Sequence, residues 1–224
     1  MGMASPDTTL GQLAQAVVAL KPELVTELAR RAIEEKITPD TVMTEGLARG
    51  MKLVGEKFAA REYFVPEVLL AARAMYAGFD IVKERMGNRE WAMGRKGKVA
   101  LGVVQGDIHD IGKNIVRVLV QASGFEVVDL GRNAPDSAFV RAAEDGCRIV
   151  GLSSLMTTTM PRMAGVIAAL DKAGLHKDTR VIVGGAPVNQ AFADTIGADG
   201  YAPDAHSAVK LIEELAAGST NPGR

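Results

Sequence analysis

Apolar residues along this chain follow two different patterns, and the change falls between residues 88 and 98. Before residue 88 they recur at spacings of three and four, which is the period of an amphipathic helix. The clearest such stripe consists of Leu47, Met51, Val54 and Phe58. After residue 98, short unbroken apolar runs alternate with further helical stretches. The pattern therefore predicts a helical part followed by an α/β part.

Helix start signals divide the first part into four helices. Pro22 and Pro66 suit the first turns of the second and fourth helices, because proline lacks the N–H group that is unpaired there. Thr38 precedes Pro39 and is the expected N-cap of the third helix. Four helices with short connections predict a compact bundle.

Five apolar runs in the second part predict strands, at 98–104, 126–129, 148–152, 180–183 and 199–201. A helical pattern follows each run, so we expect a mostly parallel five-stranded sheet with helices on both faces. A flavodoxin-like or Rossmann-like fold with strand order 2-1-3-4-5 fits this length.

The stretch between the two parts is rich in glycine and charge. Residues 87–98 show no apolar periodicity, which is typical of an interdomain linker. Trp91 lies within this stretch and is expected to pack on one of the two domains. We expect a helical domain over 1–89, a linker over 90–98 and an α/β domain over 99–224.

Bulk composition excludes several functional classes. The formal net charge is −1, which gives no electrostatic reason to bind nucleic acid or an anionic membrane. Cys147 is the only cysteine, which excludes an internal disulfide framework and a cysteine zinc cage. The N-terminus has no signal-peptide pattern, and no apolar stretch reaches membrane-spanning length. We therefore expect a cytoplasmic protein without nucleic-acid or membrane partners.

The stretch after the first predicted strand carries the most distinctive chemistry. It places His109 between Asp107 and Asp110, and ligands bind at the carboxyl ends of strands in open α/β sheets. Asp107 can accept a hydrogen bond from one ring nitrogen of His109, which raises the basicity of the other nitrogen. Such a histidine suits either metal ligation or general base catalysis. His176 and His206 lie in polar, surface-like stretches, and we assign them no role.

Two further loops are expected at the same edge of the sheet. The stretch 151–159 after the third strand is dense in hydroxyl groups, which suits hydrogen bonds to a polar ligand. Gly184 and Gly185 follow the fourth strand and would let a ligand approach the backbone closely. Each loop by itself is typical of an ordinary turn or helix cap, and only their shared edge predicts a site.

A metal held by protein side chains alone would need more ligands than this sequence offers. It has no HxxxH motif, no cysteine pair and no cluster of carboxylates around His109. One axial nitrogen is enough, however, when the metal arrives inside a macrocycle.

Three aromatic residues, Phe58, Tyr63 and Phe64, gather near the junction of the third and fourth helices. They fit two interpretations, either as core residues of the bundle or as an apolar lid over a ligand. Helical spacing alone favours the core.

Together, the motifs Asp107-x-His109-x-x-Gly112, Ser153-x-Leu155 and Gly184-Gly185 resemble the signature of the cobalamin-binding domain. The spacings agree as well, because 40 residues separate the first motif from the second and 28 separate the second from the third. The helical part resembles the cap domain of methionine synthase. From about residue 10 to 217, the chain is similar to the stand-alone corrinoid proteins of anaerobic methyltransferase systems, which act on methanol, methylamines, methoxylated aromatics or betaines.

The resemblance implies cobalamin or a related corrinoid as the cofactor, with methylcobalamin as the loaded form and His109 as the cobalt ligand. Asp107 would hydrogen-bond the far nitrogen of His109, and Thr159 would complete a relay that couples proton uptake to loss of the axial bond. Further cofactor contacts would come from Asp110, Ile111, Gly112, Ser153, Leu155, Thr157, Gly184, Gly185 and Ala186. Phe58 and Val65 would cover the methyl face, and Arg61 stands where relatives often have glycine.

The function implied by the resemblance is that of a methyl carrier. Cobalt would accept a methyl group with the help of a substrate-specific methyltransferase. It would pass the group on through a second methyltransferase, to tetrahydrofolate or a thiol coenzyme. A reductive activase would restore cobalt that has been oxidised. The helical cap would swing aside for either partner, with the linker as its hinge.

Three alternatives fit the sequence less well. A cobalamin-binding sensor without a methyl-transfer role usually carries a DNA-binding helix-turn-helix ahead of its cap, and only about nine residues precede the first expected helix here. Cofactor subunits of adenosylcobalamin mutases generally lack the cap. A receiver-type signalling domain would need an acidic phosphoacceptor after the third strand, where this chain has Ser153 and Ser154.

Overall fold

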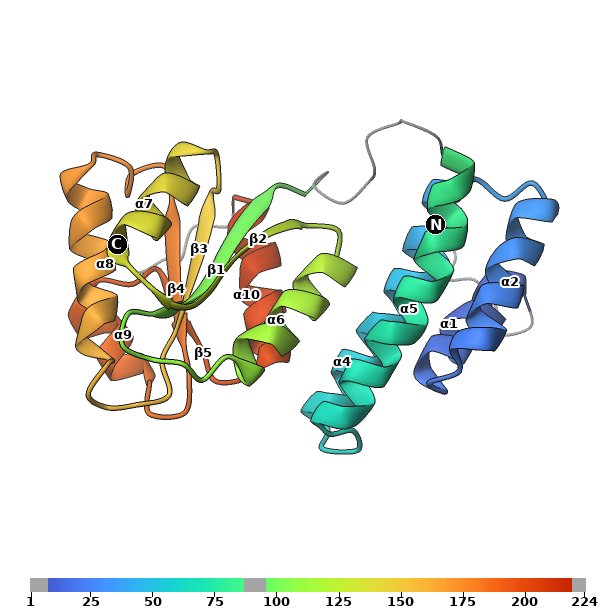
Figure 1. The fold of residues 1–224 in the computed structure, drawn as a ribbon, viewed down its shortest axis with the longest axis horizontal. Coiled ribbons are helices and arrows are strands. Elements are labelled where there is room, and N and C mark those ends of the chain that lie inside the picture. The colour runs from blue at the N-terminus through green and yellow to red at the C-terminus, as the bar shows by residue number, and fades with distance from the viewer. Residues whose placement is uncertain (1–7, 87–95, 219–224) are drawn as a thin grey trace. The chain divides into compact units, whose positions relative to one another are not determined.

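The computed structural model describes residues 8–86 and 96–218, the first range without the side chains of its last two residues. These residues form two compact units, a helical unit and an α/β unit, which divide near residue 94 (Figure 1). Most of the expected linker, including Trp91, lies outside the described residues. None of the described helices combines the length and the apolar composition needed to cross a bilayer.

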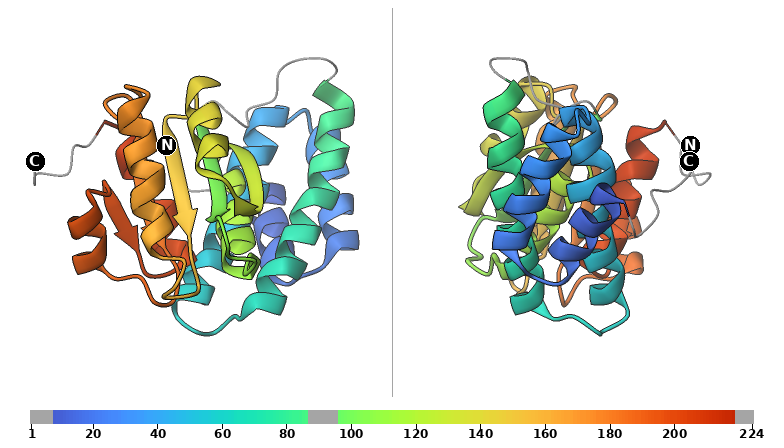
Figure 2. Two further views of the ribbon diagram at one scale, coloured as in Figure 1. Left: turned by 60° about the vertical axis from the view of Figure 1, so that its left-hand side comes forward. Right: turned by 90° about the vertical axis from the view of Figure 1, so that its right-hand side faces the viewer.

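The helical unit consists of α1 (Thr9–Val18), α2 (Pro22–Glu34), α3 (Pro39–Thr41), η1 (Val42–Ala48), α4 (Arg49–Ala59) and α5 (Val65–Met86). The expected third helix is a continuous run of α3, η1 and α4, in which η1 has the wide turns of a π-helix. Thr38 caps this run as predicted, because its Oγ1 accepts a hydrogen bond from Thr41 N at 3.3 Å. Figure 2 shows α1, α2, α4 and α5 side by side, which confirms the predicted four-helix bundle. Its fully buried centre includes Leu13, Val17, Val25, Leu47, Met51, Val54 and Val68.

The α/β unit confirms the predicted fold class. Its strands are β1 (Lys98–Val104), β2 (Glu126–Ala134), β3 (Ile149–Ser153), β4 (Arg180–Gly184) and β5 (Gly200–Ala202). All neighbours pair in parallel in the order β2-β1-β3-β4-β5, as expected. The helices are α6 (Ile111–Ala122), α7 (Asp136–Glu144), α8 (Pro161–Lys172), α9 (Gln190–Ile196) and α10 (Ala205–Ala216).

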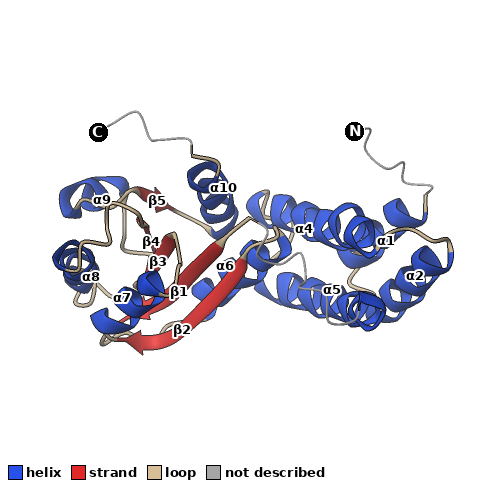
Figure 3. Ribbon diagram, turned by 90° about the horizontal axis from the view of Figure 1, so that it is seen from above, coloured by secondary structure: helices blue, strands red, loops and turns tan. Residues whose placement is uncertain are grey.

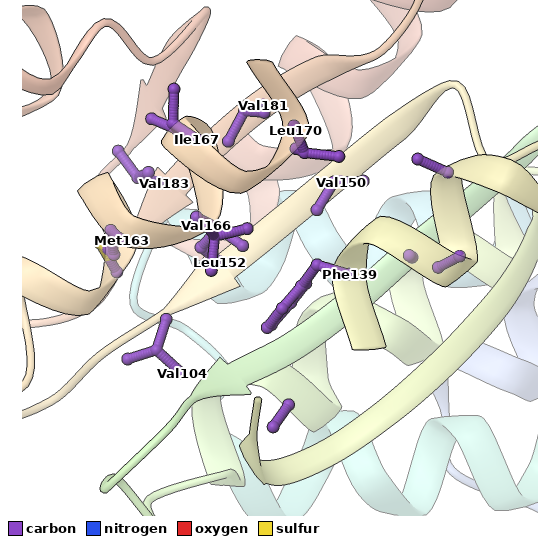
Figure 4. Close-up of a cluster of buried hydrophobic side chains, with 14 of the residues drawn as sticks. Val104, Phe139, Val150, Leu152, Met163, Val166, Ile167, Leu170, Val181 and Val183 are labelled. Atoms are coloured by element: carbon purple, nitrogen blue, oxygen red, sulfur yellow. The ribbon is translucent and has the colours of Figure 1, made fainter. Parts of the chain in front are cut away.

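Two apolar layers hold this sheet between its helices. Figure 3 shows α6 and α10 on one face and α7 and α8 on the other. On the second face, Phe139 of α7 packs beside Leu152 of β3 and Val166 of α8, as Figure 4 shows. On the first face, Phe125 and Ile212 pack against β1, β3 and β4. The two layers leave the carboxyl ends of the strands to be covered by loops alone.

Two features of this unit differ from the sequence analysis. The second strand was expected to end near residue 129, but β2 continues to Ala134, because an edge strand tolerates polar residues. The surface-like description of His176 was wrong, since this side chain is only 9% exposed. Its ring contacts Asp171 and Asp199 at the amino-terminal edge of the sheet.

Candidate functional site

The loop between β1 and α6, residues 105–110, is called the histidine loop here. Its Asp107 side chain is completely buried, while the His109 side chain is 47% exposed. Oδ1 of Asp107 accepts a hydrogen bond from His109 N at 3.0 Å and lies 2.7 Å from Nδ1 of the same residue. The imidazole is therefore held against the aspartate on one side and open on the other.

The second oxygen of Asp107 is bound by the loop after β3, residues 154–160, which is called the hydroxyl loop here. Oδ2 accepts hydrogen bonds from Leu155 N at 2.7 Å and from Thr159 Oγ1 at 3.0 Å, with Met156 N at 3.3 Å. Ser154 Oγ lies 3.3 Å from Oδ2 and 2.8 Å from Thr159 Oγ1. One carboxylate thus joins the two loops.

These contacts decide the protonation of the pair. Burial by itself would raise the pKa of the Asp107 carboxyl, but hydrogen bonds from the His109 and Leu155 N–H groups, with further contacts, hold it well below its usual range. An ionised carboxylate only accepts hydrogen bonds, so Nδ1 of His109 must carry the proton. In the uncharged form of this ring Nε2 presents a lone pair, and Nε2 has no hydrogen-bond partner among the described residues. This is the state in which a histidine binds a metal.

Four exposed apolar side chains, called the apolar rim here, lie near His109 in the sequence or on the hydroxyl loop that binds Asp107. Ile108 and Ile111 are 61% and 67% exposed, and Leu155 and Met156 on the hydroxyl loop are 46% and 39% exposed. These four are the exposed large apolar side chains of the α/β unit, within the residues that the structure describes. Such a concentration of apolar surface beside one polar atom is typical of a ligand-binding face.

The glycines of the site serve two different purposes. A Cβ built on Gly112, at the start of α6, would meet no atom within 4 Å, so packing does not explain this glycine and the space before it is open. At Gly185, by contrast, φ is +125° and a Cβ would lie 1.8 Å from Ser154 O. Gly184 O also accepts a hydrogen bond from Ser154 N at 3.2 Å. Gly185 therefore fits the loops to each other, whereas Gly112 stands at an open, exposed position.

The other predicted contact residues lie on the same three loops. Ser153 ends β3, and Thr157 and Ala186 are exposed on the loops that follow β3 and β4. Asp110 is half-buried directly before α6. Within the part of the chain that the structure describes, none of these four side chains makes a hydrogen bond to the protein.

Two residues of the site were missed by the sequence analysis. The hydroxyl that reaches Asp107 beside Thr159 belongs to Ser154, the neighbour of Ser153, and its side chain is completely buried. The alternation of side chains along a strand could have indicated that one of two neighbouring serines turns inward. Asn133 at the end of β2 hydrogen-bonds the histidine loop, and no sequence signal pointed to it.

The predicted cap residues lie at the α4–α5 end of the helical unit. Phe58 and Val65 are half-buried there and Phe64 is 63% exposed, whereas Tyr63 is tied to the bundle by a 2.7 Å hydrogen bond to Val18 O. Arg61 has φ of +59°, the left-handed conformation that favours glycine. The loop therefore keeps the backbone shape that glycine would give it.

The donors of this site fit a metal that arrives in its own macrocycle. Nowhere in the described residues do three or more histidine, cysteine, aspartate or glutamate side chains gather as a metal cage. His109 instead offers one nitrogen above an apolar rim, beside open space at Gly112. A flat macrocycle needs an apolar bed and one axial nitrogen, and both are present.

Comparison with known proteins agrees with this geometry. Residues 97–210 match the family model described as a B12 binding domain, and residues 9–83 match a second model with the same description. The chain is 42% identical to dimethylamine corrinoid protein 1 of Methanosarcina acetivorans, over 95% of this chain and 100% of that one. It is 39% identical to the trimethylamine corrinoid protein of Methanosarcina barkeri, over 94% and 98%.

Solved structures show the same likeness. A chain of the methanol:cobalamin methyltransferase complex MtaBC from Methanosarcina barkeri superposes with a TM-score of 0.85 at 32% identity, over 98% of this chain and 83% of that one. A cobalamin-binding protein from Desulfitobacterium hafniense DCB-2 gives a TM-score of 0.75 at 33% identity, over 92% and 97%. With both domains matched and the site geometry in agreement, this chain belongs to the family of B12-binding corrinoid proteins.

Proposed function

We propose that this protein carries a methyl group on the cobalt of a bound corrinoid, between one methyltransferase that loads it and another that unloads it. The observation that carries this proposal is His109, whose Nδ1 is fixed by a buried, ionised aspartate while Nε2 stays open above an apolar rim. The matched dimethylamine and trimethylamine corrinoid proteins support the same assignment. The alternative of a cobalamin sensor is not favoured, because these relatives are corrinoid proteins named for methylamines.

In this proposal, bound cobalt supplies a strong nucleophile for methyl groups and a centre from which they can leave again. The chain's own residues hold and tune that centre. His109 would hold the cobalt through Nε2, while Asp107 fixes the ring and keeps the proton on Nδ1. Thr159 and Ser154 donate hydrogen bonds to Asp107 and hold it in place.

The cofactor contacts proposed for this chain follow the rim of the site. The open space at Gly112 would take part of the cofactor beside α6, with Asp110 and Ile111 at its entrance. The remaining contacts on this side would come from Ser153, Leu155, Thr157, Gly184, Gly185 and Ala186. Phe58 and Val65 of the helical unit would cover the methyl face.

Partner proteins complete the proposal. The loading partner would be a substrate methyltransferase. A di- or trimethylated amine is the favoured donor, because the dimethylamine and trimethylamine relatives reported above are 42% and 39% identical and the chain of the methanol complex is 32% identical. A second methyltransferase would pass the methyl group to tetrahydrofolate or a thiol coenzyme. A reductive activase would return oxidised cobalt to the active state.

Reconstitution with methylcobalamin tests this function. The purified protein should bind it and show the visible spectrum of a cofactor whose own base has been replaced by histidine. His109→Ala should change that spectrum, while His206→Ala, a matched change of a histidine in the same unit, should not. Failure of the parent protein to bind any corrinoid would contradict the proposal. Light-dependent DNA binding with adenosylcobalamin would instead support a sensor.

A further inference from the structure

The carboxyl end of β2 is irregular, and it lies directly beside the histidine loop. Leu101 of β1 pairs with Asp129, but Gly102 pairs with Gly131 and Val104 with Ala134, so β2 gains an extra residue at each step. Gly131 and Asn133 both have positive φ, of 73° and 53°. Bulges of this kind redirect side chains and often lie next to functional sites.

Asn133 uses this bulge to bind the histidine loop twice. Its Oδ1 accepts a hydrogen bond from Gly106 N at 2.8 Å. Its own N donates to Asp107 O at 2.9 Å. The two bonds fix the peptide groups on both sides of the Gly106–Asp107 link, immediately before His109. The side chain of Asp107 is fixed from the hydroxyl loop, whereas its main chain is fixed by Asn133.

A second contact ties the same bulge to the helix that follows His109. Asp129 accepts hydrogen bonds from Gly131 N at 2.9 Å and from Lys113 Nζ at 2.5 Å. Lys113 lies in the first turn of α6, and its side chain is buried. The bulged end of β2 therefore holds the loop on both sides of His109, at Gly106 and Asp107 before it and at Lys113 after it.

We propose that Asn133 is a positioning residue that sets where Nε2 of His109 is presented to the cobalt. This inference rests on the proposed function, in which His109 is the axial ligand. Asparagine combines the two properties used here. Its short side-chain carbonyl reaches a nearby backbone N–H, and it tolerates the left-handed conformation better than other non-glycine residues. A residue that merely turned the chain would need only the second property.

Three substitutions separate these properties. Asn133→Gly keeps the positive φ and the backbone N–H but removes the acceptor for Gly106 N. Asn133→Asp keeps both the acceptor and the tolerance of positive φ. Asn133→Ala removes the acceptor and adds backbone strain. Arg132→Ala, a change at the exposed neighbour on the same bulge, is the matched control.

The dissociation constant of the cobalamin complex is measured for each variant. The cobalt(II) form of each complex is then examined by electron paramagnetic resonance for splitting by one axial nitrogen. Asn133→Gly and Asn133→Ala should bind cobalamin about tenfold more weakly, at the low end of the range for residues that orient a metal ligand. The fraction of bound cobalt that shows nitrogen splitting should fall in both. Asn133→Asp and Arg132→Ala should behave as the parent does.

Thermal unfolding without cobalamin separates a folding defect from lost positioning. Should Asn133→Ala fail to fold, Asn133→Gly decides, because its backbone conformation is unstrained. Parental affinity and nitrogen splitting in a folded Asn133→Gly would overturn the inference and leave the proposed function intact. Absence of histidine nitrogen on cobalt in the parent protein would overturn the ligand role of His109 and this inference with it, whereas failure to bind any corrinoid would overturn the proposed function.

Discussion

The α/β unit contains two histidines that contact aspartates, at opposite edges of one sheet. Nδ1 of His109 lies 2.7 Å from Asp107 at the carboxyl edge, and Nδ1 of His176 lies 2.8 Å from Asp171 at the amino edge. The second nitrogens differ. The His176 side chain is 9% exposed, and its Nε2 lies 3.3 Å from Asp199. The His109 side chain is 47% exposed, and its Nε2 has no hydrogen-bond partner among the described residues. A ligand histidine is therefore distinguished by its open second nitrogen and not by its aspartate.

The aspartates differ in the opposite sense. Asp107 is completely buried and collects donors from two loops, whereas the Asp171 side chain is 60% exposed. His109 is thus oriented by one fully buried carboxylate, whereas His176 lies between an exposed carboxylate, Asp171, and a buried one, Asp199. Burying a carboxylate is costly unless every oxygen is hydrogen-bonded, which explains the set of donors around Asp107.

The largest effect is expected from Asp107→Asn. An amide nitrogen would face N–H and O–H donors that now point at Oδ2, so the free energy of unfolding should fall by about 3 kcal/mol. Cobalamin affinity should fall about 10- to 100-fold, because the His109 ring loses its anchor. Urea unfolding and a cobalamin titration measure the two effects. In Asp171→Asn, the matched control, stability should change by less than about 1 kcal/mol, and equal losses in both variants would contradict the comparison.

The two histidines should respond in opposite ways to removal. His176→Ala leaves the buried Asp199 carboxylate with one hydrogen-bond partner fewer, so stability should fall by about 2 kcal/mol. Its cobalamin affinity and spectrum should not change. His109→Ala should lower stability by about 1 kcal/mol, because Asp107 Oδ1 loses the ring N–H but keeps the hydrogen bond from His109 N, and it removes the ligand of the cobalt. Thermal unfolding and visible spectra of both variants provide the test, and a spectral change in His176→Ala would break the distinction.

A smaller effect is expected at Asp129, which pairs with Lys113 instead of a histidine. Burial would raise the pKa of Asp129, but Lys113, the Gly131 N–H group and Arg117 lower it overall. Because the folded-state pKa is depressed, the pairing stabilises the fold above the unfolded value of about 4 and this contribution is lost as pH falls through the folded value. The stability advantage of the parent over Asp129→Asn, followed by thermal unfolding, should therefore be greatest near neutral pH and shrink in acid. A difference that does not vary with pH would mean that Asp129 acts by packing alone.

The difference between the histidines also shows what sequence can predict. Asp107 lies two positions from His109 in one loop, so their contact could be expected from the sequence alone. Asp199 lies 23 positions from His176 and reaches it only because β4 and β5 pair. The surface-like interpretation of His176 failed for this reason, since tertiary pairing buried a polar stretch.

The same principle explains why the strands could be predicted from the sequence and the role of Asn133 could not. Buried parallel strands are continuous apolar runs, so their positions and order could be predicted. The bulged end of β2 is polar, and its course depends on hydrogen bonds to the histidine loop and on the Lys113–Asp129 pair. Neither is visible as a local pattern. The fold was therefore more predictable than the residues that hold the site in place.

The central claim is that Nε2 of His109 is the axial ligand of the bound corrinoid. It is tested most directly by electron paramagnetic resonance of the cobalt(II) form in two protein samples. One sample is produced with ordinary histidine and the other with histidine labelled with nitrogen-15. We predict that labelling converts the three-line nitrogen splitting into two lines, and that His109→Ala abolishes the effect. A three-line splitting that persists in the labelled protein would show that the cofactor's own base remains bound, which would contradict the account.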